Sequence, residues 1–251
     1  MAVVSVLAIG SARAADAESL LLPGIDIRSI DFAVGTWCRY RVVDEALGQA
    51  DTSEVMLAIV GRESTPDGPA YWLEIETCPL GGSDDDRDCS RVLVDDRVRT
   101  MAAGDSVYHF VRRFYIKKGN GPVEAGDPRD LKRLTVVFPD SGSLVGVMSD
   151  MRIRTAAGAI NCELSQFETD ESRDVPAGRI VIRQRRVDRV KVWVSLVIPV
   201  FHLARCEIER LRESKAVPPV RGVPDSGPRT SRTTSEILSY GTGAKARISP
   251  P

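Results

Sequence analysis

Two histidines, His109 and His202, are the side chains in this chain best suited to acid–base chemistry near neutral pH. Each lies in a stretch rich in aromatic or aliphatic residues, and neither has a second histidine at metal-ligand spacing. Ser195 offers a hydroxyl, but its surroundings lack the tight glycine turn of a hydrolase nucleophile. We therefore predict structural histidines, no enzymatic activity and no cofactor.

The acidic loop between two cysteines is the one candidate metal site. Asp84, Asp86 and Asp88 have the alternate spacing of the first ligands of an EF-hand loop, and Asp95 falls at the twelfth place. The sixth place, where such a loop needs glycine, is Cys89. We predict a solvated loop and no metal, with calcium binding as the open alternative.

Five cysteines fit an oxidising compartment better than a reducing one: Cys38, Cys78, Cys89, Cys162 and Cys206. Cys78 and Cys89 flank the acidic loop, and we predict a disulfide between them. The odd count leaves at least one thiol unpaired or paired between chains. Cys38 and Cys206 lie in apolar strand patterns, where buried, inert thiols are the alternative.

Two groups of charged residues, one acidic and one basic, are predicted to face solvent. Glu74 and Glu76 are two residues apart and so share one face of a strand, which we predict to be the solvent face. Arginines cluster between apolar residues in the segment 183–189, at Arg183, Arg185, Arg186 and Arg189. This pattern is typical of the solvated face of a hairpin, with a basic contact for anionic lipid headgroups or a partner as the alternative.

The composition is that of an ordinary globular protein. The 251 residues are 43% hydrophobic, and 35 acidic residues nearly balance 34 basic ones, for a formal net charge of -1. A chain of this length forms one β-rich domain or two smaller ones. We expect no nucleic-acid partner, because no run of basic residues is long enough for a phosphate-binding stripe.

The N-terminus resembles an export signal. An apolar run over residues 1–10 is followed by Ala12-Arg13-Ala14, a small-x-small motif that predicts cleavage before Ala15. No Lys or Arg precedes the run, so either the true start lies upstream or the signal is weak. We predict a signal peptide over 1–14 and a periplasmic or secreted protein that is peripheral to the membrane at most.

Short β-type segments separated by Gly/Pro turns predict an antiparallel meander. The expected strands are 31–43, 53–62, 69–78, 107–118, 131–138, 144–154, 160–167, 178–186 and 190–195. The segment 90–103 has a roughly helical spacing and predicts a short helix. The expected β-rich domain covers 15–214, followed by a Pro/Gly/Ser-rich linker over 215–251 with a candidate edge strand at 236–241.

The most apolar stretch is Val190 to Glu209, which Pro199 divides into two halves. Its dense apolar part is too short to span a bilayer, which needs about 20 residues of helix. Proline also breaks a helix. The stretch predicts a strand, a proline-marked corner and a second strand that line one apolar compartment.

Several short motifs resemble those of an uncharacterised group of exported bacterial β-rich proteins, which are similar in pattern to the half-barrel of outer-membrane lipoprotein carriers. The motifs are Gly35–Tyr40, Ala58–Glu63, Tyr71–Glu74, Trp193–Ser195 with Pro199, and Leu238–Gly241. The resemblance implies a curved sheet that holds acyl chains against short helices. No functional residue of the carriers can be placed on this chain.

We therefore predict a mainly β fold in which a curved antiparallel sheet forms a half-open barrel with one or two short helices. A hydrophobic small molecule, lipid or lipoprotein acyl chain is the expected partner, with Trp37, Trp72, Trp193 and Phe201 lining the cavity. Plain core packing is the alternative for these aromatics. The alternative function is a structural or partner-binding envelope protein without a ligand.

Overall fold

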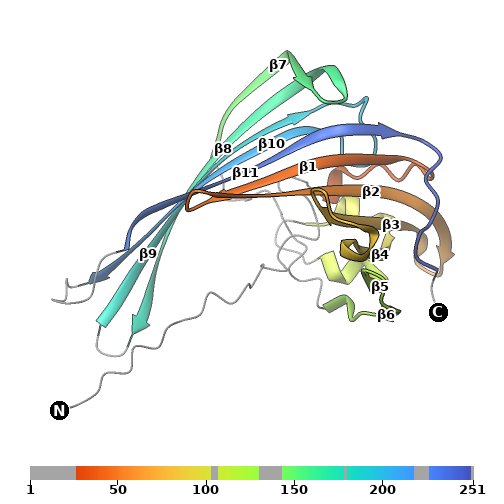
Figure 1. The fold of residues 1–251 in the computed structure, drawn as a ribbon, viewed down its shortest axis with the longest axis horizontal. Coiled ribbons are helices and arrows are strands. Elements are labelled where there is room, and N and C mark those ends of the chain that lie inside the picture. The colour runs from red at the N-terminus through yellow and green to blue at the C-terminus, as the bar shows by residue number, and fades with distance from the viewer. Residues whose placement is uncertain (1–26, 103–106, 130–142, 178–179, 218–225, 250–251) are drawn as a thin grey trace.

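One antiparallel sheet makes up most of the protein. The computed structural model describes residues 27–102, 107–129, 143–177, 180–217 and 226–249 (Figure 1). Their eleven strands form a curved sheet that stays open, which confirms the predicted fold class. The strands are β1 (Trp37–Ala46), β2 (Gln49–Thr65), β3 (Gly68–Pro79), β4 (Asp88–Asp95), β5 (Val111–Lys118), β6 (Val123–Ala125), β7 (Ser143–Thr155), β8 (Gly158–Ala177), β9 (Ile180–Val194), β10 (Leu203–Val217) and β11 (Ser226–Gly241).

The chain enters the sheet at its centre. Strands β1 to β6 follow one another to one edge, the chain then crosses to the opposite edge, and β7 to β11 return to the centre beside β1. The order is therefore β6-β5-β4-β3-β2-β1-β11-β10-β9-β8-β7. Strands β6 and β7 are the two edges, and the sheet is open between them.

The two faces of the sheet follow from alternation along the central strand. Cys38, Tyr40 and Val42 of β1 are buried on one face, here called the inner face, while Arg39 and Arg41 lie on the other, the outer face. Residues paired across antiparallel strands share a face, so the register extends this division across the sheet. The main apolar cluster covers the inner face.

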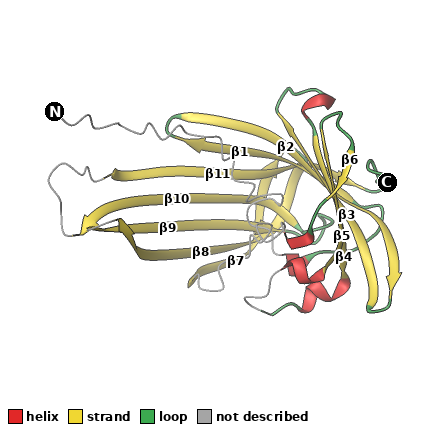
Figure 2. Ribbon diagram, turned by 90° about the horizontal axis from the view of Figure 1, so that it is seen from below, coloured by secondary structure: helices red, strands yellow, loops and turns green. Residues whose placement is uncertain are grey.

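All helices in the described residues are short 3-10 helices, and none of them is long and apolar enough to cross a membrane. They are η1 (Ile27–Ser29), η2 (Asp84–Asp86), η3 (Asp96–Thr100) and η4 (Val107–Phe110). Three of them, η1, η3 and η4, contribute buried residues to the main cluster. Figure 2 shows helices beside β3, β4 and β5 and none along the far ends of the long strands.

The predicted helix over 90–103 is wrong. Its first half is strand β4, and only Asp96–Thr100 turns into the 3-10 helix η3. Strand β4 pairs with β3 and β5 and is buried on both faces from Cys89 to Asp95, so its sequence lacks the alternation of a half-buried strand. Periodicity alone cannot separate such a strand from a buried helix.

Two predicted boundaries also differ from the structure. The segments 178–186 and 190–195 are predicted as two arms of a hairpin, but their residues 180–186 and 190–194 belong to the single strand β9, which pairs with β8. The predicted linker from 215 contains the end of β10 and all of β11. Strand β11 lies between β1 and β10 at the centre of the sheet, so its segment 236–241 is no edge strand. Cross-strand pairing on both sides outweighs the Gly/Pro/Ser composition.

Some predictions fall outside the described residues. These are the signal peptide over 1–14 and the strand over 131–138. The predicted strand, corner and strand around Pro199 is confirmed, because β9 ends at Val194 and β10 begins at Leu203.

All five cysteines are free thiols, so the predicted Cys78–Cys89 disulfide is absent. Cys89 lies opposite Glu76 in the register of β3 and β4, whereas Cys78 lies two residues further along β3. The thiol of Cys78 donates to the carbonyl oxygen of Ser83 instead, at 3.7 Å. Burial raises the pKa values of Cys38, Cys89 and Cys206 to about 12, so these thiols stay protonated and weakly reactive near neutral pH.

We expect five maleimide adducts when the protein is unfolded without reductant, because all five thiols are free. In the native state at pH 8, Cys38, Cys89 and Cys206 should stay unlabelled because they are buried and protonated. Intact-mass spectrometry counts the adducts in both states. Two fewer adducts in the unfolded sample would show that a disulfide forms after all.

Candidate ligand-binding site

The inner face of the sheet is the apolar compartment that the sequence predicts. Its main cluster combines inward-facing residues of strands on both halves of the sheet with residues from the segments that cover them. Leu57 of β2 and Leu73 of β3 contribute from one half, and Val192 of β9 and Cys206 of β10 contribute from the other. The covering segments are residues 27–32, the helices η3 and η4, and the loop between β9 and β10.

The loop of residues 195–202, which we call the Pro199 loop, fills part of this compartment. Ile198, Val200 and Phe201 are buried in the main cluster at 0%, 0% and 3% exposure. Leu196 and Val197, at the other side of the loop, are 86% and 62% exposed. The loop is thus apolar both where it enters the core and where it meets solvent.

The backbone of the Pro199 loop is strained. Val200 has φ 70° and His202 has φ 58°, values in the left-handed region. A β-branched residue such as valine is rarely found there, because its branched Cβ crowds the backbone. Each such residue costs roughly 1–3 kcal/mol. The burial of the loop's apolar side chains offsets this cost.

A few hydrogen bonds hold the loop in place. The N–H of Asp31 donates to the carbonyl of Val200 at 2.7 Å, and the N–H of Ser195 donates to the carbonyl of His202 at 2.7 Å. The ring Nδ1 of His202 lies 2.8 Å from the carbonyl oxygen of Ile198. Because a carbonyl can only accept, Nδ1 is the protonated nitrogen. This contact agrees with the structural role predicted for His202.

The four aromatic residues predicted to line the cavity do not share one site. Phe201 and Trp193 belong to the main cluster. Trp193, however, pairs with Arg205 and so lies on the outer face of β9, where the Arg205 guanidinium lies over its ring. Trp72 lies in a separate small cluster with Ala70 and Leu93 on the outer face. Trp37 is partly exposed on the outer face, where its indole N–H donates to the carbonyl of Thr242 at 3.2 Å.

Trp72 makes polar contacts as well as apolar ones. The indole N–H of Trp72 donates to Glu63 at 2.8 Å. The guanidinium groups of Arg91 and Arg113 lie 4.5 and 4.9 Å from its ring centroid, within the range of cation–π attraction. These contacts indicate a structural role for Trp72.

Glu74 and Glu76 are buried, so the prediction that they face solvent is wrong. The C-terminal segment covers them: the N–H groups of Arg247 and Ile248 donate to the Glu74 carboxylate at 3.0 and 3.2 Å. Arg91 donates to the carbonyl of Ile248. Burial raises the pKa of Glu74, and the two backbone hydrogen bonds oppose that rise. The cluster anchors the C-terminal segment to β3.

The acidic residues of the EF-hand-like pattern are divided between two places. Residues Asp84–Asp86 form the 3-10 helix η2, which Ser83 caps. Asp95 lies at the other end of β4, is 1% exposed and accepts from Arg97 at 2.7 Å and from Arg112 at 2.8 Å. No group of three or more acidic, His or Cys side chains suited to a metal ion occurs among the described residues.

The sequence analysis did not single out the residues of the Pro199 loop whose side chains pack into the compartment. Ile198 and Val200 flank Pro199, and the apolar run around a proline corner was the available signal. The positive φ of Val200 could not be foreseen, since valine normally avoids it.

Comparisons with known proteins give only distant likenesses. No protein-family model and no curated protein matches the chain. A candidate lipoprotein from Parabacteroides distasonis superposes with a TM-score of 0.35 at 13% identity, covering 85% of this chain and 98% of its own. A candidate exported protein with a YmcC-like fold, from Bacteroides fragilis, gives 0.32 at 11% identity, covering 83% and 96%. Such low TM-scores do not establish a common fold, and the likeness to lipoprotein carriers stays a prediction.

We expect Asp95→Asn to lower the free energy of unfolding by about 1.5–3 kcal/mol at pH 7, the range for hydrogen bonds to a charged group. The hydrogen bond from Arg97 is the largest cause that lowers the pKa of Asp95, so its stabilisation is complete above the unfolded pKa near 3.9 and is lost as the pH falls below it. Urea unfolding should therefore show a smaller difference from wild type at pH 3 than at pH 7. Asp96→Asn, which removes a more exposed partner of Arg99, is the control and should have little effect. A pH-independent difference would contradict this assignment.

We expect Glu74→Ala to release the C-terminal segment, because Arg247 and Ile248 lose their acceptor. Brief trypsin treatment should then cut at Lys245 or Arg247 faster than in wild type, as read by intact-mass spectrometry. Glu45→Ala removes an exposed glutamate of β1 and should leave the cleavage rate unchanged. Equal rates for all three proteins would show that Glu74 does not anchor the segment.

Proposed function

We propose that this protein is a non-enzymatic binding protein of the cell envelope that takes up an apolar ligand, a lipid or lipoprotein acyl chain, on the inner face of its sheet. The observation that carries the proposal is the Pro199 loop. It is strained at Val200, yet it places three apolar side chains in the compartment. A ligand with an apolar chain would replace these side chains.

The energetics favour the Pro199 loop as the part that moves. Strain of roughly 1–3 kcal/mol at a single residue lowers the cost of leaving the native conformation. The loop lies outside the strand ladders, so its departure breaks few backbone hydrogen bonds. Replacing its buried side chains with acyl methylene groups would restore about 0.8 kcal/mol for each buried methylene.

The exposed tip of the loop supports the same proposal. Leu196 and Val197 present apolar surface to solvent at the place where a ligand would enter. Isolated exposed apolar residues are common, but here both belong to the segment that has to open. A contact between this tip and a lipid surface would favour opening. The predicted export signal supports a periplasmic or secreted location for such a protein.

The second candidate function is a structural or partner-binding envelope protein without a ligand. The observation that favours it is the packing of the inner face, where the residues of the Pro199 loop, η3 and the strands are buried together. A hollow of about 170 Å³ beside Arg39, Glu54 and Arg87 has a largely polar lining, which does not suit an acyl chain. In this function the Pro199 loop is permanent core.

Substitution of one phenylalanine in the loop and one in the sheet separates the two functions. Phe201 of the loop and Phe114 of β5 are both 3% exposed in the main cluster. We expect Phe201→Leu to raise the affinity of the delipidated protein for a fluorescent fatty acid several-fold, because it makes room in the compartment and weakens the closed state. Phe114→Leu should change the affinity less than twofold. Each variant should lose up to about 1.5 kcal/mol of stability.

Co-purifying lipid, identified by mass spectrometry after export of the whole chain, is the accompanying measurement. Saturable binding that responds to Phe201→Leu and not to Phe114→Leu supports a displaceable loop. No bound lipid and no fatty-acid binding by either the wild type or Phe201→Leu would overturn the proposal in favour of the structural role.

A further inference from the structure

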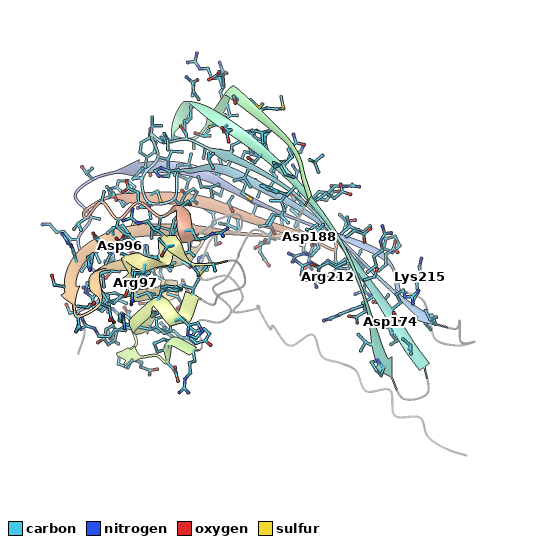
Figure 3. The ribbon with its side chains drawn as sticks, turned by 180° about the vertical axis from the view of Figure 1, so that it is seen from behind. Asp96, Arg97, Asp174, Asp188, Arg212 and Lys215 are labelled. Atoms are coloured by element: carbon cyan, nitrogen blue, oxygen red, sulfur yellow. The ribbon has the colours of Figure 1, made fainter. Side chains whose placement is uncertain are left out.

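The far ends of the long strands form an arm that carries much of the charge of this half of the sheet. The arm comprises residues 168–177 of β8, 180–190 of β9, 207–217 of β10 and 226–233 of β11. Figure 1 shows these ends projecting away from β3 to β6. Figure 3 shows Asp174, Arg212 and Lys215 along the projecting part, with Asp188 nearer its base.

Most arginines of the arm are neutralised by acidic partners on a neighbouring strand. These pairs are Arg183 with Asp174 at 2.9 Å, Arg185 with Asp170 at 2.6 Å, Arg189 with Glu168 at 3.1 Å, Arg210 with Asp188 at 3.0 Å and Arg232 with Glu207 at 3.1 Å. The basic cluster of the sequence is therefore largely a cross-strand ion-pair ladder. An anion would have to compete with a carboxylate at each of these positions.

One row of the arm departs from this pattern. Arg186 of β9 lies opposite Arg212 of β10, and Arg212 lies opposite Arg229 of β11. Paired residues share a face, so three guanidinium groups start from adjacent positions about 4.8 Å apart. Arg186 is bound to Asp188. Neither Arg212 nor Arg229 makes an ion pair with any residue that the structure describes.

Such a row is unfavourable without a counter-ion. Like charges directly opposite one another on a sheet destabilise it. Glu171 of β8 lies opposite Arg186 at one end of the row, but among the described residues no carboxylate forms an ion pair with Arg212 or Arg229. The row borders a groove of about 880 Å³. Five arginines and two glutamates line this groove beside Ser172, Gln184 and Ser214: Arg173, Arg185, Arg186, Arg212, Arg229, Glu171 and Glu213.

We propose that this groove is a binding site for a phosphoryl group, with Arg212 at its centre and Arg229 beside it. A carboxylate is satisfied by one guanidinium, whereas a phosphoryl group brings up to two charges and three acceptor oxygens. The guanidinium groups of Arg212 and Arg229, with Ser214 beside them as a hydroxyl donor, match the larger demand. The site lies at the far end of the same sheet face, outside the main apolar cluster, and goes beyond the apolar ligand proposed above.

Isothermal titration of the whole chain with pyrophosphate at low ionic strength tests the site. Arg212→Gln should weaken binding by about tenfold, because it removes the central bidentate donor. Arg189→Gln changes the net charge of the same arm equally, but its guanidinium already pairs with Glu168, so binding should change less than twofold. Arg212→Gln should keep or raise the thermal unfolding midpoint, because it relieves repulsion within the row.

Co-sedimentation with phosphatidylcholine vesicles, with and without phosphatidic acid, identifies the source of the phosphoryl group. Pyrophosphate binding alone points to a soluble phosphorylated compound, and additional Arg212-dependent binding to the acidic vesicles points to a lipid headgroup. No pyrophosphate binding, or equal losses in Arg212→Gln and Arg189→Gln, overturns the site. Fatty-acid binding should be the same in Arg212→Gln and wild type, so failure here is distinguishable from failure of the proposed function.

Discussion

The pairing of β1 with β11 is the constraint on which the rest of the structure depends. It runs from Trp37 opposite Gly241 to Ala46 opposite Ser231 and joins the two halves of the sheet. Without it, the strands β1–β6 and β7–β11 would be separate meanders, each with an apolar face open to water. With it, the inner face is continuous, and the Pro199 loop, next in the chain after β9, reaches a core to which both halves contribute.

Local sequence patterns correctly predicted the first strands and the corner at Pro199. Strand β1 alternates clearly, β1 to β3 end at turns that contain Gly or Pro, and the corner at Pro199 follows from the missing N–H of proline. Long-range effects account for the errors. Strand β4 does not alternate because both of its faces are buried. Strand β11 was not predicted because its sequence is rich in Ser and Thr, and it forms a strand only by pairing with β1 and β10.

The candidate sites depended even more on contacts between distant segments. Which face carries Trp72 or Trp193 is set by bulges and register, which no single strand encodes. Glu74 is buried because residues 247–248 return to cover it, and Arg212 faces Arg186 and Arg229 only in the assembled sheet. The residue types limited which kinds of site the chain could form, but only the folded structure showed which residues contact one another.

The central position of the first and last strands also governs the order in which the molecule can fold. During synthesis β1 can pair with β2 early, but its other edge waits for β11, almost two hundred residues later. A sheet with so many distant pairings is expected to form slowly. Until the last strand arrives, half of the backbone groups of β1 and much apolar surface stay open to other chains. A nascent chain of this kind therefore benefits from a holding factor until its final residues emerge.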